Sequence, residues 1–139
     1  MKKNIIIIVL VLIVIALSCL VIFKHDNHTY IKDTDMYQRI NKDDINEIVI
    51  RYNGLVAEPI DPVELSEKKD IDEVFTALGN IEVLDKVNVK VMDSSMVIIV
   101  YTNELSLEFN FEADFFITSD GNHATKGFEQ FEELLKKYN

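Results

Sequence analysis

The sequence of 139 residues holds few of the residues that build disulfide frameworks, thiolate metal sites or phosphate-binding loops. Its single cysteine excludes an intrachain disulfide and a zinc site made of several cysteines. Its four glycines are dispersed along the chain, which excludes a glycine-rich loop that cradles phosphate. No serine has the Gly-x-Ser-x-Gly setting of the hydrolase nucleophile elbow. We therefore expect a protein that is not an enzyme and that holds no cofactor.

Cations are scarce as well, since 14 Lys and Arg residues stand against 24 Asp and Glu residues, for a net charge of −10. All of the acidic residues follow position 23, where only 12 of the cations lie, so this part of the chain carries a charge of −12. Binding to a nucleic-acid backbone requires an excess of cations, and nucleic acid is therefore excluded as a partner. An acidic surface either attracts a basic polypeptide or serves only to keep the domain dissolved.

A long apolar run sets the expected location. Residues 5–23 include 18 apolar residues out of 19, with no charge, proline or glycine. At about 1.5 Å per residue, a helix of this length approaches the roughly 30 Å hydrocarbon thickness of a bilayer. Lys2 and Lys3 precede the run and an acidic segment follows Lys24, so the positive-inside rule places the N-terminus in the cytoplasm. We expect residues 1–23 to be a membrane anchor or signal segment, with the rest of the chain on the extracytoplasmic side of the cell membrane.

Two fates of this segment stay open, and they differ at Cys19. Residues 15–19, Ile-Ala-Leu-Ser-Cys, resemble the lipobox of bacterial lipoprotein signals, in which the cysteine is lipidated and becomes the mature N-terminus. Against this, Ala16 stands where the pattern most often has leucine, and residues 20–23 are still apolar. A retained single-pass helix is the interpretation that we favour, with Cys19 as a candidate lipidation site.

The rest of the chain divides into a stalk and a domain. Residues 24–44 are polar, with scattered apolar side chains and no sustained period, which predicts a stalk that joins the domain near residues 36–40. The domain is expected over residues 45–139, because no internal repeat or low-complexity stretch interrupts them.

The domain opens with a hairpin signal. Residues 48–52 alternate as in a strand, Asn53-Gly54 follows as a two-residue turn, and residues 55–58 favour a second strand. Pro59 and Pro62 are expected to end this second strand and to mark it as an edge of the sheet.

Two helices are predicted, over residues 70–78 and 127–138. In the first, Asp70 and Glu73 have the spacing of a capping box, and Gly79 is placed to end the helix in the left-handed conformation. The second has glutamates in its first half and lysines near its end, which suits the helix dipole. Each helix carries one apolar stripe, formed by Ile71, Val74, Phe75 and Leu78 in the first and by Phe128, Phe131, Leu135 and Tyr138 in the second.

Four further strands are predicted over residues 83–92, 96–102, 105–111 and 115–118. Residues 105–111 alternate apolar with polar, so one face is buried and the other meets water, whereas the apolar start of the strand over residues 96–102 indicates a central strand covered on both sides. Short joints between the strands favour antiparallel neighbours. The predicted order is β-β-α-β-β-β-β-α, an α+β fold whose antiparallel sheet has both helices packed on one face.

The layout as a whole carries a family resemblance. A short lysine-led anchor is followed by a hairpin, a helix that opens Asp-x-x-Glu and an antiparallel meander, and a final helix ends with Leu-Leu-Lys-Lys-Tyr at residues 134–138. This layout resembles the small membrane-anchored or lipoprotein-like extracytoplasmic proteins of Gram-positive bacteria that carry a domain of unknown function. The resemblance implies an extracytoplasmic, non-catalytic protein, and it supplies no site residues.

One acidic group resembles a calcium loop only in part. Asp33, Asp35 and Asp44 have a loop-like spacing, but Tyr37 replaces the third ligand and Gln38 occupies the position that needs glycine for a sharp turn. We therefore exclude an EF-hand and expect no metal site there.

The histidines and the remaining motifs also have explanations other than metal binding, glycosylation or catalysis. His25 and His28 are three residues apart, a spacing that suits a transition metal, but we interpret them as polar residues of the stalk. His123 lies in a predicted solvated turn, and the glycosylation sequon at Asn27 lies too close to the apolar run to be used. Carboxylate pairs such as Glu132-Glu133 have capping or solubility roles on helices, so a glycosidase is not expected.

These observations together predict a membrane-tethered extracytoplasmic domain that binds a ligand or serves as an accessory module of the cell envelope. An alternative is an acidic inhibitor or immunity-type protein that neutralises a basic secreted enzyme or peptide. A small hydrolase is a third hypothesis, which the lack of a nucleophile constellation disfavours. The expected partners are the membrane and an envelope protein or basic polypeptide.

Overall fold

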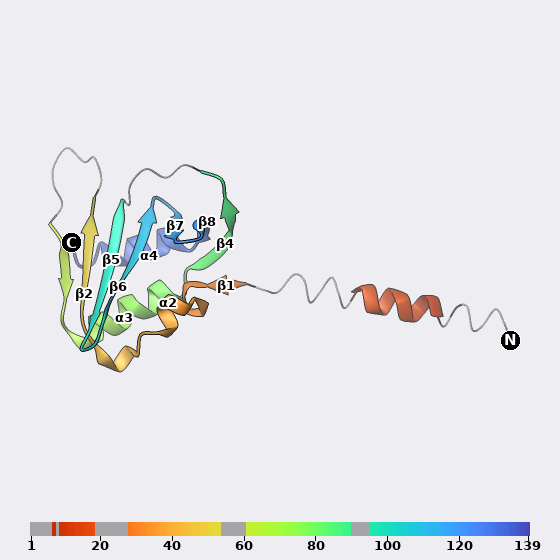
Figure 1. Cartoon of the computed structure of the whole chain (residues 1–139), viewed down its shortest axis with the longest axis horizontal. Coiled ribbons are helices and arrows are strands. Elements are labelled where there is room, and N and C mark those ends of the chain that lie inside the picture. The colour runs from red at the N-terminus through yellow and green to blue at the C-terminus, as the bar shows by residue number, and fades with distance from the viewer. Residues whose placement is uncertain (1–6, 8, 19–27, 54–60, 90–94) are drawn as a thin grey trace.

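The computed structural model describes residue 7 and residues 9–18, 28–53, 61–89 and 95–139 (Figure 1). The domain is an α+β fold built on one eight-stranded antiparallel sheet, which confirms the predicted class. The strands are β1 (Thr29–Tyr30), β2 (Ile45–Tyr52), β3 (Val63–Leu65), β4 (Glu82–Val87), β5 (Met96–Thr102), β6 (Ser106–Glu112), β7 (Phe115–Thr118) and β8 (Gly121–Lys126). The helices of the domain are α2 (Asp35–Gln38), α3 (Lys68–Gly79) and α4 (Phe128–Leu135), with short 3-10 helices η1 (Ile31–Asp33) and η2 (Lys42–Asp44).

The core lies on one face of the sheet, where α3 and α4 cover it. Alternation along β6 turns Phe109 and Phe111 toward this face, and both side chains are fully buried. The apolar stripes of α3 and α4 belong to the same core cluster as these phenylalanines. The prediction that both helices pack on one face of an antiparallel sheet is therefore confirmed.

The strand order differs from the predicted meander. The sheet runs β1-β4-β8-β7-β6-β5-β2-β3, so β5 pairs with β2 and β6, and β4 pairs with β1 and β8. The expectation that the short joint at residues 93–95 links two paired strands was wrong, because β4 pairs with β1 and β8 and not with β5. Residues 88–95 therefore connect two strands that are not adjacent. Residues 90–92 of the strand predicted over residues 83–92 lie outside the described residues.

Two strands lie where the sequence analysis did not place them. The predicted second strand of the hairpin, residues 55–58, lies outside the described residues. The strand that pairs with β2 on that side is β3, which begins directly after Pro62 and was not predicted. Strand β3 lies at the edge of the sheet. An additional strand, β8, begins at Gly121 and pairs with both β4 and β7. The predicted solvated turn around His123 is thus a strand.

The segment expected to be a stalk is folded from Thr29 onward. Ile31 is fully buried and Ile40 is 7% exposed, and both side chains belong to the main core cluster. The ring of Tyr37 stacks on Phe75 with centroids 4.2 Å apart, and its hydroxyl donates to the Phe75 carbonyl oxygen at 2.9 Å. Burial raises the pKa of Tyr37 to about 12, because the charged phenolate loses its hydration. Residues 29–44 are therefore part of the domain, and the prediction of a stalk over them was wrong.

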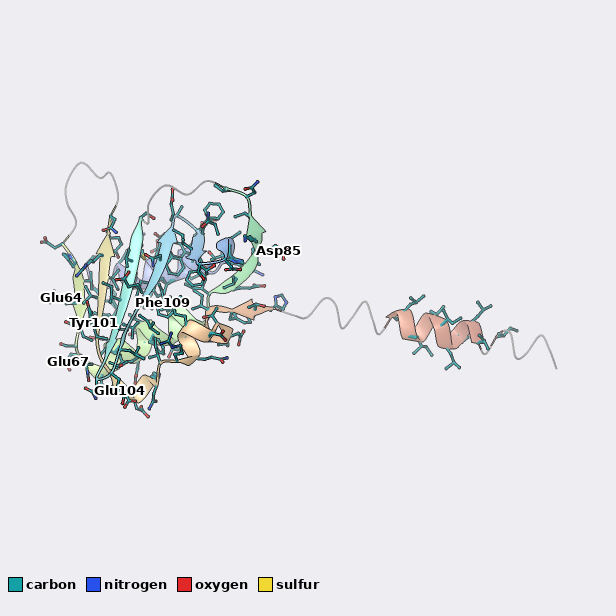
Figure 2. The ribbon with its side chains drawn as sticks, in the orientation of Figure 1. Glu64, Glu67, Asp85, Tyr101, Glu104 and Phe109 are labelled. Carbon is teal, nitrogen blue, oxygen red and sulfur yellow. The ribbon has the colours of Figure 1, made fainter. Side chains whose placement is uncertain are left out.

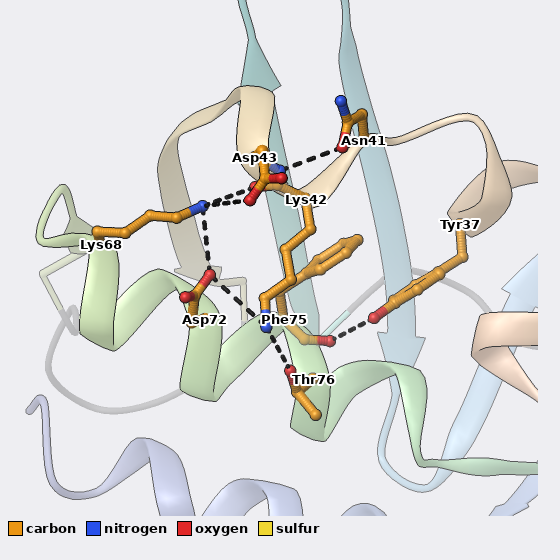
Figure 3. A network of polar contacts seen from close by, with 8 residues as sticks. All are labelled: Tyr37, Asn41, Lys42, Asp43, Lys68, Asp72, Phe75 and Thr76. Atoms are coloured by element: carbon orange, nitrogen blue, oxygen red, sulfur yellow. Dashed lines mark hydrogen bonds and ion pairs between the residues drawn. The ribbon is translucent and has the colours of Figure 1, made fainter.

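Charged groups fix the same segment to α3 (Figure 3). Asp72 Oδ1 lies 3.3 Å from Lys68 Nζ and 3.6 Å from Lys42 Nζ. The Lys42 ammonium also donates to Thr76 Oγ1 at 3.1 Å, and the Lys68 ammonium donates to the Lys42 carbonyl oxygen at 2.9 Å. Asp72 Oδ1 accepts no hydrogen bond of good geometry, so its attraction to the two ammonium groups is electrostatic. Together these contacts join η2 to α3.

The end of α3 also differs from the prediction. Helix α3 begins at Lys68 with Glu67 as its N-cap, and no side chain caps that end, so Asp70 is not the capping residue. Gly79 is the last helical residue, and it is not among the positive-φ glycines of the described residues, which are Gly121 and Gly127. The left-handed glycine instead precedes α4, where Gly127 has a φ of 92° and serves as the N-cap.

The apolar N-terminal run is described only in part. Residues 9–18 are helical, and the Ser18 hydroxyl donates to the Val14 carbonyl oxygen at 2.8 Å. Among the described residues, no helix has the length and apolar character needed to cross a membrane. Cys19 lies outside the described residues.

Candidate interaction surface

The face of the sheet opposite the helices carries a second, smaller apolar cluster. Val49, Val97 and Ile99 form it, with Tyr101 packed beside them. Their neighbours along β2 and β5 point into the main core, so alternation places this cluster on the other face. Val97 and Ile99 are 9% and 4% exposed, so β5 is buried on both faces, as predicted for a central strand, although no described helix lies over this cluster. We call this side of strands β3, β2, β5 and β6 the open face.

The strand register places carboxylates at both ends of an apolar row on this face. Val49 pairs with Ile99 across β2 and β5. Glu64 on β3 pairs with Val49, and Glu108 on β6 pairs with Ile99. Directly paired residues share a face, so the row reads Glu64, Val49, Ile99 and Glu108. At about 4.8 Å per strand, its two ends are roughly 14 Å apart.

Neighbouring rows extend the same pattern. One row joins Glu47 to Tyr101, and another joins Arg51 to Val97. At the far end of β6, Glu112 pairs with Phe115 of β7. Strands β2, β3, β5 and β6 together contain the acidic residues Glu47, Glu64, Glu108 and Glu112, and the one basic residue Arg51. The open face therefore has carboxylates around an apolar centre that is almost fully buried, since Val49, Val97 and Ile99 are 6%, 9% and 4% exposed.

The border carboxylates differ from the acids that hold the domain together. Within the described part of the chain, Glu64 and Glu108 are exposed and neither forms an ion pair or side-chain hydrogen bond. By contrast, Glu73 Oε2 accepts from Lys137 Nζ at 2.7 Å and from the Tyr138 hydroxyl at 2.9 Å. The lysine and tyrosine hydrogen bonds lower the pKa of the Glu73 carboxyl. The unpaired border carboxylates are thus free to meet cations from another molecule.

Glu82 is a second structural acid, at the opposite side of the sheet. It contacts the His28 ring, and its other oxygen lies 3.6 Å from Lys126 Nζ. The hydrogen bond with His28 is the main cause of the lowered pKa of the Glu82 carboxyl. His28 therefore has a structural partner at β4, and it is not paired with a second histidine among the described residues, since His25 lies outside them.

The remaining candidate residues have local structural contacts. His123 lies on β8, with Nδ1 at 3.2 Å from the Leu84 carbonyl oxygen and Nε2 at 3.5 Å from Asp120. Asp33 accepts from the backbone N–H of Tyr30 at 2.8 Å, and Asp44 accepts from the Asn41 amide at 2.9 Å. No group of three or more metal-ligating side chains comes together in the described ranges. The sequon at Asn27 is outside these ranges.

Sequence reasoning found part of the open face. The alternation over residues 105–111 placed Glu108 on the solvent-facing side of its strand, as observed. It did not place Glu64 in any strand, because β3 has only three residues and follows a proline. The pairing of β2 with β5 joins residues about fifty positions apart, and no local pattern reports it.

Comparisons with family models, with curated proteins and with solved structures find no match for this chain. Val49, Val97 and Ile99 at the centre of the open face are only 6%, 9% and 4% exposed, so they offer little apolar area to a partner. The exposed carboxylates of Glu64 and Glu108 are the groups that would select a partner of opposite charge. This arrangement suits binding of a basic polypeptide.

Proposed function

We propose that this protein is a membrane-tethered binding or accessory module of the cell envelope, not a catalyst, with its folded domain on the extracytoplasmic side. The apolar run over residues 5–23 supports the tether, and Lys2 and Lys3 on its short side support the orientation. The tether is a single-pass helix or a lipid on Cys19. The layout-level resemblance to small anchored or lipoprotein-like proteins of Gram-positive bacteria supports the same assignment.

The observation that carries the binding role is the row of Glu64, Val49, Ile99 and Glu108. A binding surface needs apolar area that is lost from water and polar groups that favour one partner over another. The row supplies the polar groups, because the exposed carboxylates of Glu64 and Glu108 have no partner among the described residues that a ligand would have to displace. Val49 and Ile99 between them are 6% and 4% exposed and add little apolar area.

The acidic border also favours a more specific candidate. In this second function, the domain is an inhibitor or immunity-type protein that neutralises a basic secreted enzyme or peptide. Four carboxylates against one arginine on four strands would speed the encounter with a cationic partner and weaken it at high salt. Lysine and arginine stems also pack well over an apolar centre while their charges reach the border.

Site-specific crosslinking on intact cells tests the binding role. A photoreactive residue replaces Glu108 on the open face in one variant and Asp85, an exposed acid on β4, in the control. We expect adducts with a basic polypeptide from position 108 that are absent from position 85 and weaken as salt is raised. Identical adducts from both positions, or a partner rich in acidic residues, would contradict the proposal.

The tether is tested by Cys19→Ala. For a helical anchor, the variant stays in the membrane with unchanged mass apart from the substitution. For a lipoprotein, the wild-type chain carries an added lipid at Cys19 and has lost residues 1–18, and the variant accumulates as the longer precursor. Release of the unmodified full-length chain from lysed cells without detergent would contradict both forms of the tether.

A further inference from the structure

Strand β3 is an open edge of the sheet. It is the last strand in the sheet order, and β1 is the strand at the opposite edge. The chain enters the domain through β1, so a tether on the N-terminal side leaves the β3 edge unobstructed (Figure 1). Among the described residues, the backbone of Val63, Glu64 and Leu65 pairs only with β2. The outward-facing N–H and C=O groups of β3 therefore lack a protein partner there, which is the condition for adding another strand.

A groove of about 490 Å³ runs beside this edge. Its walls include β3 itself, Asp61 before it, Asp70 of α3, and Tyr138 and Asn139 after α4. Asp61, Glu64 and Asp70 give it three carboxylates, and no lysine or arginine of the described residues lines it. The nearby ammonium of Lys137 lies 2.7 Å from Glu73, which already pairs with it. The groove is therefore acidic and is bordered by open backbone groups.

We propose that the β3 edge binds an extended segment of a basic polypeptide in which cationic and apolar residues alternate, and that this segment adds to the sheet as a ninth strand. The pattern follows from β3, where Val63 and Leu65 face the core and Glu64 faces the open side. On an added strand, apolar residues would extend the core face beside Tyr138. Cationic residues would lie on the open side near Glu64. This inference rests on the second candidate function and names the form of its partner.

A second copy of the chain is a poorer occupant of this edge. Pairing of β3 with β3 would bring Glu64 of each copy close to the same carboxylates of the other, with no cation in the groove to compensate. Like charges on facing strands are destabilising, and a basic segment removes this repulsion. Charge thus selects a basic partner over self-association.

Two synthetic peptides test strand addition on the full chain in detergent. The probe is an alternating Lys-Val peptide of about six residues, the usual length of a strand. The control alternates Lys with Pro, so it has the same length and charge but loses half of its backbone N–H donors. We expect the Lys-Val peptide to bind at least about tenfold more tightly, and to protect the amides of residues 61–67 from hydrogen exchange. Equal binding of the two peptides, or protection confined to other strands, would overturn the proposal.

Charge reversals separate this proposal from the function on which it rests. Asp61→Lys changes the groove, Glu108→Lys changes the far side of the open face, and Asp85→Lys is the matched control on β4; Figure 2 marks Asp85 at the opposite side of the domain from Glu64. We expect Asp61→Lys to weaken Lys-Val binding about fivefold at low salt and Asp85→Lys to leave it nearly unchanged. Loss with Glu108→Lys but not with Asp61→Lys would overturn strand addition while leaving the open face as the binding surface. Loss with none of them would overturn both.

Discussion

The phenol ring of Tyr37 occupies the space that a side chain on Gly79 would fill. A Cβ atom on Gly79 would lie 2.6 Å from the Tyr37 hydroxyl oxygen and 2.7 Å from the carbon that bears it. The same ring stacks on Phe75, one turn earlier in α3. Gly79 thus allows α3 to approach the segment before β2 closely. The predicted role of Gly79, as the left-handed end of the helix, was a different one.

Gly79→Ala is expected to destabilise the domain. Alanine gains up to about 1 kcal/mol over glycine in helix propensity, but overpacking a filled site costs about 1–3 kcal/mol. The clash with Tyr37 should therefore dominate and lower the free energy of unfolding, measured by urea denaturation of the full chain in detergent. A double-mutant cycle supplies the control, because in a Tyr37→Ala background only the gain in propensity remains. The same loss in both backgrounds would show that Tyr37 is not the neighbour that matters.

Ile31→Ala tests whether residues 29–44 belong to the domain. Ile31 is fully buried in the main core, so its truncation should lower the free energy of unfolding by about 2–5 kcal/mol. Lys32→Ala is the matched control, because the neighbouring lysine is exposed and should have little effect. If this segment were a stalk, the two substitutions would be indistinguishable in the same denaturation experiment.

Acid pH should weaken the contact between α3 and the residues that follow α4. The pKa of Glu73 is lowered from its ordinary value of 4.5, so its ionised form is favoured in the folded state. Its contribution to stability is fully present above about pH 4.5 and is lost as the pH falls through the lowered folded value. Glu73→Gln should therefore show a smaller loss of stability than the wild type between pH 7 and pH 3.

The same contact has an opposite response at high pH. The hydrogen bond to Glu73 raises the pKa of Lys137 above 10.5, so its contribution to stability is present below that pH and is lost as the pH rises through the raised value.

Glu129→Gln is the control for the Glu73→Gln experiment at acid pH, since Glu129 is exposed on α4 without an ion pair among the described residues. Identical pH profiles of free energy for the two Gln variants would contradict this role of Glu73.

Reversing the border charges should leave the fold intact. Glu64 and Glu108 are exposed and without side-chain partners in the described part of the chain, so the double variant Glu64→Lys/Glu108→Lys should change the free energy of unfolding by less than about 0.5 kcal/mol. Phe109→Ala, on the core side of the same strand, should cost about 3–5 kcal/mol. A large loss in the double lysine variant would mean that these carboxylates are structural and would weaken their assignment to binding.

The elements that the sequence predicted well are those with a sustained period. The apolar stripe of α3 and the alternation of β6 identified core residues such as Leu78 and Phe109. The elements that it missed lack such a period. Strand β8 has mostly small and polar residues and is fixed by pairing on both sides, and Ile31 and Ile40 are isolated buried residues within a polar segment. Tertiary contacts determine both the strand β8 and the burial within the polar segment, so no local sequence pattern predicts them.

Composition and strand alternation predicted only part of the candidate surface. An excess of acidic residues predicted an acidic surface, and alternation placed Glu108 toward solvent. The row that joins it to Ile99, Val49 and Glu64 exists because β5 pairs with β2 and β2 with β3. The surface is created by the register between strands that are far apart in the sequence, and not by the local strand propensity of its residues.

The most direct test of the account is the side of the membrane on which the domain lies. Cys19 is the only cysteine, so Cys19→Ala with Glu104→Cys places one thiol in the exposed turn between β5 and β6. Intact cells are treated with a membrane-impermeant maleimide, and membranes are then separated from the soluble fraction. The account predicts a labelled chain that sediments with the membranes. Labelling that occurs only after lysis, with the chain in the soluble fraction, would contradict it.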